Sequence, residues 1–299
     1  MLPPPVKHGD RLRIISPAGP VETERLTAGV ELLKSWGYQV ETAPHALFRS
    51  GFLAGSDNDR LNDLTATLLD PEIDGVICSR GGYGSVRLFD MIDWDVIAAT
   101  KPKCFVGFSD ISAFQLLLHA RCGWSSLSGP QAAIGLSGGV TERSLAHLRG
   151  MMDGSWRKLS WGKDTETRLQ NVSGGGAGGV LLPCNLSMLV SLLGTSYMPN
   201  LSGAILCLED LAEPPYKIDR MLWQLSHSDA SKELVAIVIG EFTYENSSVS
   251  ESACQSAFDH FGSELPIWWG LPYGHIDDLL TFPVGVDVEI DNDGLFKML

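Results

Sequence analysis

The feature that most restricts the fold of this chain is a repeating order in its first half. Short apolar runs, each typical of a β-strand, alternate with helical spacing of apolar residues. The strand-like runs lie at 11–19, 38–44, 74–78 and 103–106, and the helical patterns lie at 22–36, 59–71 and 110–121. A strand, a crossover helix and a second parallel strand form the usual repeating unit of α/β proteins. The sequence therefore predicts an α/β fold, with an N-terminal domain over 1–150 built on a parallel sheet covered by helices on both faces.

The pattern changes after residue 150. The stretch 151–172 is polar and rich in Gly, Ser and Trp, which predicts a linker, and the Gly-rich 174–179 follows it. Further strand-like runs lie at 203–210, 233–242 and 284–290, and helical patterns lie at 185–193, 216–226 and 250–261. We expect residues 173–299 to form a second, smaller α/β domain with a barrel-like sheet.

Composition excludes several classes of partner. The 299 residues carry a net charge of −14, which argues against nucleic acid and anionic membranes, because both favour basic proteins. The sequence shows neither a signal peptide nor about 18 uninterrupted apolar residues, so we expect a cytoplasmic protein. The six cysteines are scattered without a C-x-x-C pair, which predicts reduced core residues and argues against a zinc site.

The stretch 103–116, KCFVGFSDISAFQL, places a Ser-Asp pair on a sharp strand-to-helix turn. A serine there points toward the carboxyl end of the sheet, where ligands bind in such folds, so Ser109 is a candidate nucleophile. The alternative is that Ser109 or Asp110 merely caps the helix. An ordinary α/β-hydrolase esterase is disfavoured, because Ile111 stands where its G-x-S-x-G motif needs glycine.

A second candidate region is SRGGYGS, 79–85, after the third strand-like run. Two adjacent glycines, Gly81 and Gly82, let the backbone approach a substrate closely, and their N–H groups are candidates for an oxyanion hole. Arg80 is a candidate for binding a substrate carboxylate, unless it pairs with a local Asp. The region is equally compatible with a tight turn, and no nucleotide-binding motif is present.

The second half offers an acid and a base. Glu209, Asp210 and Glu213 follow an apolar strand-like run, and each is a candidate for orienting a histidine. His275 lies in a loop after Gly274, a position more often structural than catalytic. The order Ser…Glu…His then suggests a triad in a cleft between the two domains.

Six segments together resemble the LD-carboxypeptidases, a family of serine peptidases of peptidoglycan recycling that has the microcin C self-immunity peptidases as relatives. The segments are PAGP, GFLAGSDNDRLNDL, SRGGYG, GFSD, LEDLAEPPYKIDRML and GHIDDLLTFPVG. They appear in the family's order over about residues 10–285. One departure is Pro183-Cys184-Asn185, where the family often has G-G-N.

The resemblance implies a flavodoxin-like N-terminal domain and a smaller C-terminal domain with a barrel-like sheet. It implies Ser109 as nucleophile, His275 as base and Glu209 as the residue that orients His275. The backbone N–H groups of Asp110 and Gly82 would form the oxyanion hole. It further implies a small muropeptide as substrate, cleaved before a terminal D-Ala without a cofactor, and a homodimer.

Two rival functions remain. A microcin C-type immunity peptidase would cleave an aminoacyl- or peptidyl-sulfamoyl-adenosine and would need an aromatic side chain to stack on the adenine, for which Trp156 and Trp161 are candidates. A non-catalytic protein that binds a small ligand would have an unreactive Ser109.

Overall fold

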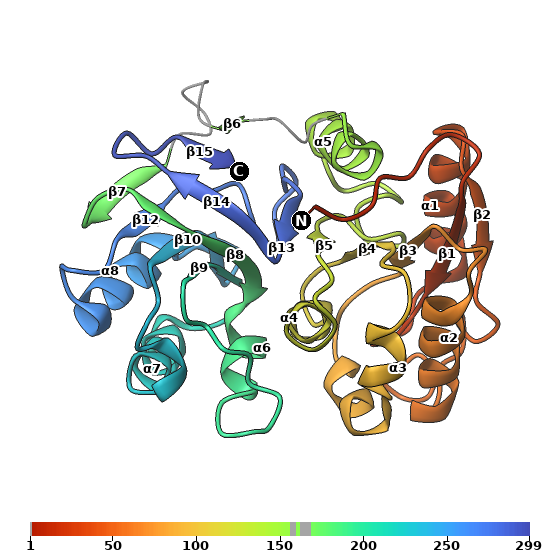
Figure 1. The fold of residues 1–299 in the computed structure, drawn as a ribbon, viewed down its shortest axis with the longest axis horizontal. Coiled ribbons are helices and arrows are strands. Elements are labelled where there is room, and N and C mark those ends of the chain that lie inside the picture. Colours follow the sequence, from red (N-terminus) through yellow and green to blue (C-terminus); the bar gives the residue numbers. More distant parts are fainter. Residues whose placement is uncertain (1, 156–159, 162–168) are drawn as a thin grey trace. The chain divides into compact units, whose positions relative to one another are not determined.

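The computed structural model describes residues 2–155, 160–161 and 169–299, which fall into two compact units (Figure 1). The N-terminal unit comprises Leu2–Trp156 and Leu280–Val284, and the C-terminal unit comprises Arg157–Leu279 and Gly285–Leu299. The segment Leu280–Val284, which the sequence analysis assigned to the C-terminal domain, thus belongs to the N-terminal unit.

A six-stranded sheet forms the centre of the N-terminal unit, in the order β13-β5-β4-β3-β1-β2. The strands are β1 (Arg11–Ile15), β2 (Gln39–Thr42), β3 (Gly75–Cys78), β4 (Cys104–Gly107), β5 (Ser126–Ser128) and β13 (Phe282–Val284). The first five are parallel, and their order 2-1-3-4-5 is that of flavodoxin-like folds. Only β13 is antiparallel, paired with β5. Strands β3 and β4 are buried along their whole length, which explains their continuous apolar sequences.

Five helical segments connect the parallel strands: α1 (Thr23–Ser35), α2 (Asp57–Leu69), the 3-10 helix η1 (Ser85–Met91), α3 (Trp94–Ala98) and α4 (Ile111–Cys122). Helix α5 (Glu142–Asp153) follows β5. Helix α4 is largely buried, since every residue of Ile111–Leu118 lies in the core. This helix ends at Gly123, whose φ of 68° is the left-handed conformation that favours glycine. The helix that directly follows the Ser-Asp turn is therefore an anchored core element.

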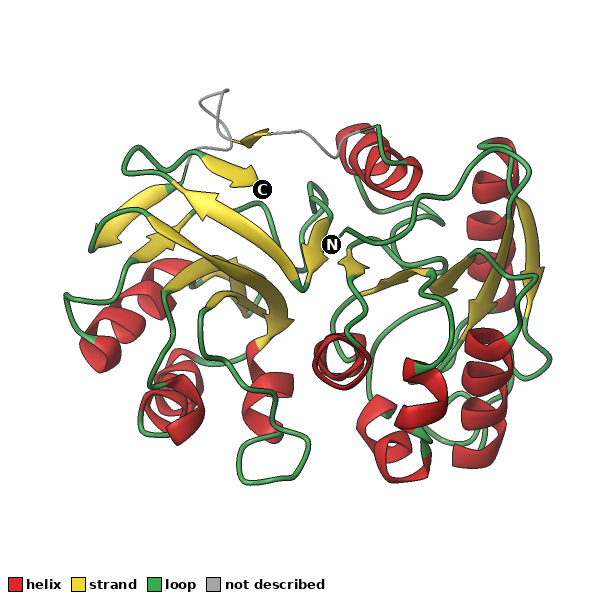
Figure 2. Ribbon diagram, in the orientation of Figure 1, coloured by secondary structure: helices red, strands yellow, loops and turns green. Residues whose placement is uncertain are grey.

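The C-terminal unit contains a nine-stranded sheet that curls into a half-barrel. Its central strands β8 (Ala177–Asn185), β9 (Ala204–Asp210), β10 (Ala236–Tyr244) and β12 (Ile267–Trp269) are parallel. Antiparallel strands complete it: β6 (Ser160–Trp161), β7 (Gln170–Ser173), β11 (Ser247–Ser248), β14 (Val286–Ile290) and β15 (Phe296–Met298). Helices α6 (Leu186–Ser191), α7 (Pro215–Ser226) and α8 (Ser250–Phe261) line up beside this sheet, and the 3-10 helix η2 (Asp229–Ser231) follows α7 (Figure 2).

The predicted α/β class is confirmed, with a flavodoxin-like sheet and a curled second sheet. One difference from the sequence analysis is that β8 begins inside the Gly-rich run 174–179. A Cβ at Gly179 would lie 2.3 Å from the carbonyl oxygen of Gly203. Glycine there permits the backbones of neighbouring strands to lie close together. Composition alone cannot tell glycines with this role from glycines of a flexible segment.

Candidate active site

Ser109 lies directly after β4 in a strained turn. Its φ of 62° is left-handed, a conformation that costs a residue with a Cβ about 1–2 kcal/mol. The turn is closed by the Ile111 N–H donating to Phe108 O at 3.3 Å and the Ser112 N–H donating to Ser109 O at 2.8 Å. Strain of this kind persists where the surrounding structure enforces it, and it is concentrated at functional sites.

The helix-cap interpretation of the Ser-Asp pair lacks support. Asp110 occupies the N-cap position of α4, but its side chain makes no capping hydrogen bond. The buried Asp110 carboxylate instead accepts hydrogen bonds from the Gly84 N–H at 3.1 Å and the Ser85 N–H at 2.9 Å. The Ser85 hydroxyl donates to Asp110 O at 2.9 Å. Asp110 thus ties the turn after β4 to the glycine loop after β3.

The pKa of Asp110 is raised. Burial is the dominant cause, and it outweighs the hydrogen bonds from Ser85 and Gly84 and the charge of the nearby Arg60 guanidinium, all of which favour the carboxylate. Arg60 is itself 1% exposed and donates to Pro17 O and Gly84 O. The same cation therefore connects the glycine loop to the turn after β1.

The glycine loop approaches the Ser109 turn closely. A Cβ at Gly81 would lie 2.9 Å from Ser109 Cβ and 3.1 Å from Asp110 N, so only glycine fits there without displacing the turn. Gly82 has a φ of +98°, which favours glycine for conformational reasons. The Gly81 N–H donates to Gln131 Oε1 at 2.9 Å, which leaves Gly82 as the better oxyanion-hole candidate of the two glycines.

Arg80 is half-buried, and its guanidinium donates to Pro20 O at 3.2 Å. Across the described ranges it forms no ion pair with an acidic side chain, so the alternative of a local Asp partner is not supported. A guanidinium has five donors, and the remaining ones could bind a carboxylate.

In the C-terminal unit, Glu209 and His275 form a hydrogen-bonded pair. Glu209 lies near the carboxyl end of β9 and is completely buried, and its Oε2 is 2.7 Å from His275 Nδ1. Burial of the His275 ring disfavours its charged form, but the Glu209 carboxylate, its hydrogen bond and the Asp210 charge outweigh burial and raise the pKa of His275. Such a pair is the orienting half of a Ser-His-acid triad.

Asn185, at the end of the neighbouring strand β8, holds the acidic pair in place. Its Nδ2 donates to Glu209 Oε1 at 3.1 Å and to Asp210 Oδ1 at 2.8 Å, while its Oδ1 accepts from the Met188 N–H and caps α6. The other Asp210 oxygen accepts from the Ser187 N–H at 2.9 Å and the Ser187 hydroxyl at 2.6 Å. Asp210 therefore supports α6, whereas Glu209 contacts the histidine.

The loop that holds His275 lies against β10. A Cβ at Gly240 would meet Tyr273 O at 2.3 Å, and a Cβ at Gly274 would meet Glu241 Cβ at 2.8 Å. The Glu241 N–H donates to Tyr273 O at 2.7 Å. Two glycines and a main-chain hydrogen bond thus position His275 beside Glu209.

The predicted site residues form two groups. Ser109, Asp110, Arg80, Gly81 and Gly82 share the carboxyl-end edge of the N-terminal sheet, and Glu209 and His275 share a hydrogen bond in the C-terminal unit. Trp156 lies outside the described residues, as does the side chain of Trp161.

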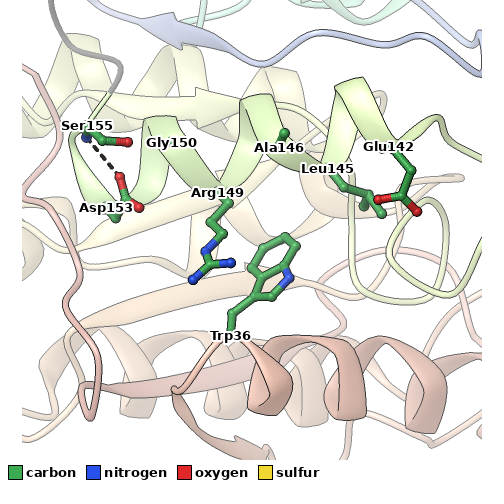
Figure 3. A pocket seen from close by; sticks show the side chains of 8 residues that line it. All are labelled: Trp36, Glu142, Leu145, Ala146, Arg149, Gly150, Asp153 and Ser155. Carbon is green, nitrogen blue, oxygen red and sulfur yellow. Dashed lines mark hydrogen bonds between the residues drawn. The ribbon is translucent and has the colours of Figure 1, made fainter.

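A hollow of about 340 Å³ lies between the C-terminal end of α1 and helix α5 (Figure 3). The end of α1 is on the side of the N-terminal sheet where β2 begins. The Arg149 guanidinium carbon lies 5.9 Å from the centre of the Trp36 ring there. Because α1 runs back from the carboxyl-end edge to the start of β2, this hollow is remote from the Ser109 turn. The part of the chain that the structure describes contains no group of three or more His, Cys, Asp or Glu side chains suited to a metal ion.

Comparison with known proteins places both units in one family. Residues 12–129 match the LD-carboxypeptidase N-terminal domain, and residues 178–290 match the LD-carboxypeptidase C-terminal domain, of peptidase family S66. The chain belongs to the LD-carboxypeptidase family. It is therefore an enzyme, a serine peptidase of the LD-carboxypeptidase type.

Relatives from several bacteria match almost the whole chain. A protein of Streptomyces coelicolor named as a carboxypeptidase is 37% identical, covering 95% of this chain and 91% of its own. The murein tetrapeptide carboxypeptidase of Pseudomonas aeruginosa is 32% identical, covering 95% of this chain and 94% of its own.

Solved structures have the same fold. The muramoyltetrapeptide carboxypeptidase of Oxalobacter formigenes superposes with a TM-score of 0.82 at 30% identity, covering 96% of this chain and 97% of its own. An MccF-like protein of Bacillus anthracis superposes with a TM-score of 0.86 at 27% identity, covering 100% of this chain and 99% of its own. No helix among the residues that the structure describes is both long and apolar enough to cross a membrane.

The sequence analysis missed the roles of two polar side chains, Gln131 within the N-terminal group and Asn185 within the C-terminal group. Gln131 follows β5, and Asn185 is the last residue of β8. Each lies at a strand end close to a candidate site residue, since Gln131 contacts Gly81 and Asn185 contacts Glu209. That position was the available signal, since polar residues at strand carboxyl ends face the ligand edge.

Proposed function

We propose that this LD-carboxypeptidase hydrolyses the bond between an L-centred diamino acid and the terminal D-Ala of murein tetrapeptides, as part of peptidoglycan recycling in the cytoplasm. The observation that supports it most directly is the left-handed Ser109 in the turn between β4 and α4. The name of the Pseudomonas aeruginosa relative supports the substrate class.

In this proposal Ser109, His275 and Glu209 act as one triad. His275 Nε2 removes the proton from Ser109 Oγ, which attacks the scissile carbonyl carbon, and Glu209 holds the imidazole by its Nδ1. The N–H groups of Gly82 and Asp110 stabilise the oxyanion, each contributing about 3–4 kcal/mol. The C–N bond breaks, His275 protonates the departing D-Ala amine, and water then hydrolyses the acyl-enzyme to release the tripeptide.

A carboxypeptidase must also recognise the terminal carboxylate of its substrate. We assign this to Arg80, because its guanidinium is partly accessible and bonds only a carbonyl among the described residues. Arginine binds carboxylates with two parallel hydrogen bonds, which would fix the D-Ala leaving group relative to Ser109.

The test is incubation of the purified protein with L-Ala-γ-D-Glu-diaminopimelate-D-Ala, with D-Ala release followed by mass spectrometry. We expect release by the parent protein and by Ser137→Ala, a serine on the loop after β5, and a loss of at least about 10⁴-fold in Ser109→Ala. A tetrapeptide that ends in L-Ala is the control for stereospecificity. Equal release by Ser109→Ala would contradict the nucleophile assignment.

The second candidate is a peptidase of aminoacyl- or peptidyl-sulfamoyl-adenosine, which the likeness to the MccF-like structure favours. An intact tetrapeptide together with cleavage of an aspartyl-sulfamoyl-adenosine would select this function. If both compounds survive and Ser109 does not react with a serine-directed probe, both substrate assignments and the assignment of Ser109 as nucleophile are wrong.

A further inference from the structure

The Gln131 side chain connects the two halves of the N-terminal site. It is 3% exposed, its Oε1 accepts the Gly81 N–H at 2.9 Å, and its Nε2 donates to Phe108 O at 3.2 Å. One end of the amide thus holds the glycine loop and the other end holds the residue before Ser109. A primary amide is suited to this, since it offers an acceptor and a donor at a set separation.

Gln131 is itself held firmly. Its N–H donates to Ile134 O at 3.0 Å and its carbonyl accepts the Leu136 N–H at 3.1 Å. The next two residues, Ala132 and Ala133, donate their N–H groups to Cys78 O and Ser79 O at the end of β3. The main chain that carries the Gln131 amide is therefore fixed in position.

The peptide between Gly81 and Gly82 is constrained on two sides. Its carbonyl, Gly81 O, accepts the Gly19 N–H at 3.0 Å, and the other flank of Gly81 is held by Gln131. In a trans peptide the C=O and N–H point in opposite directions, so the Gly82 N–H points away from Gly19. Within the described ranges, neither the Gly82 N–H nor the Asp110 N–H donates to another protein atom.

We propose that Gln131 is a positioning residue that sets the distance between the Gly82 N–H and the Ser109 turn, and so completes the oxyanion hole. The inference rests on the proposed function only in taking Ser109 as the nucleophile. Oxyanion donors are effective only at about 2.7–3.1 Å from the developing charge, so a small shift of the glycine loop removes most of their contribution.

The experiment compares two buried glutamines of the same unit, each replaced by methionine of similar length. Gln131→Met removes both hydrogen bonds of the connection. The matched control is Gln115→Met, because Gln115 Nε2 donates to Leu127 O at 2.8 Å and Ser126 Oγ at 3.2 Å and makes no hydrogen bond to the glycine loop or the Ser109 turn.

The probe is a fluorophosphonate. Ser109 Oγ forms a bond to phosphorus, the P–F bond breaks, fluoride leaves with the electron pair, and the serine proton goes to the base. The phosphoryl oxygen occupies the oxyanion position, so the rate of labelling reports on the hole independently of the natural substrate. Thermal unfolding and, on the tetrapeptide, kcat and KM are measured beside it.

We expect Gln131→Met to lower both the labelling rate and kcat about 10–100-fold with KM changed less than about twofold, since the oxyanion forms only in the transition state. Gln115→Met should lose similar thermal stability but keep both rates within about twofold of the parent. A purely structural role of Gln131 would make the two variants alike, and that result would overturn the inference.

If Gln131→Met does not fold, Gln131→Glu replaces it. This variant keeps the acceptor for the Gly81 N–H and loses the donor to Phe108 O, so its labelling rate should lie below that of the parent; an unchanged rate would overturn the inference. Labelling that depends on Gln131 without tetrapeptide hydrolysis would overturn the substrate assignment alone. A parent protein that the probe does not label at Ser109 would overturn both.

Discussion

At the scale of single residues, the proposed catalysis depends on the surroundings of Ser109 and His275. Ser109 is held in a left-handed conformation that a residue with a Cβ rarely adopts, and His275 is held by a carboxylate that has no access to solvent. The left-handed backbone of Ser109 costs folding free energy, and so does removal of the Glu209 carboxylate from water, which the hydrogen bond to His275 offsets. Sites that keep such costs are typically functional.

The raised pKa of His275 leads to a prediction about pH. A base must be neutral, so we expect the acidic limb of the kcat/KM profile to lie above the ordinary histidine value of about 6.5. Glu209→Gln should move this limb to lower pH, because burial then dominates, and should lower kcat/KM as well. The measurement is kcat/KM for the tetrapeptide from pH 5 to 9.

Glu213→Gln is the control, since Glu213 pairs with Lys217. Its pH profile should match that of the parent. An acidic limb that does not move in Glu209→Gln would refute the assignment of Glu209.

The raised pKa of His275 also makes the stability of the fold depend on pH, with a definite sign. The charged His275–Glu209 pair stabilises the fold fully below about pH 6.5, and this contribution is lost as pH rises through the folded-state pKa.

At the scale of elements, one helix position controls the loop that carries Gln131. Gly29 is buried in the middle of α1, where glycine normally costs about 1 kcal/mol relative to alanine. A Cβ at Gly29 would lie 2.0 Å from the carbonyl oxygen of Ala132. The helix accepts glycine because the loop after β5 packs directly against its backbone.

We therefore expect Gly29→Ala to destabilise the protein by about 1–3 kcal/mol despite the better helix propensity of alanine, because the Ala132 carbonyl must move. Since Gln131 precedes Ala132, kcat should fall as well. Urea denaturation and tetrapeptide kinetics measure the two effects. Thr27→Ala, on the exposed face of α1, should instead be neutral or stabilising by a few tenths of a kcal/mol; a stabilised Gly29→Ala would contradict the packing argument.

At the scale of the whole molecule, chain order and structural unit do not coincide. Strand β13, more than 100 residues beyond the other strands of its sheet, pairs with β5 through Phe282–Ser128 and Val284–Ser126. The Thr281 N–H donates to His147 Nδ1 at 3.2 Å in the same unit. The N-terminal unit therefore depends on a segment made near the end of the chain.

Phe282→Ala should reveal this dependence. The side chain is completely buried, so we expect a loss of about 3–5 kcal/mol. Hydrogen exchange should accelerate in β5, α4 and α5, and not in β8, β9 and β10. Phe296→Ala is the matched control, since Phe296 is equally buried in β15 of the other sheet and should give the reverse pattern. Faster exchange in the C-terminal unit for Phe282→Ala would contradict the division into units.

Local sequence patterns were sufficient to predict much of the fold and part of the candidate site. The alternation of strands and helices, the turn at Ser109 and the glycines 81 and 82 are visible in the sequence, because period, turn chemistry and glycine preference are properties of neighbouring residues. The family resemblance, which the comparisons confirm, rests on the same short motifs.

Tertiary structure decided the rest. The hydrogen bond between Glu209 and His275 joins residues 66 positions apart, and Gln131 contacts Gly81 across 50 positions. Strand β8 begins within a glycine-rich run because its backbone lies close to that of the neighbouring strand. Strand β13 belongs to the first sheet because it pairs with β5, which is remote from it in the chain. Such features depend on contacts between segments remote in the chain, for which a local pattern contains no signal.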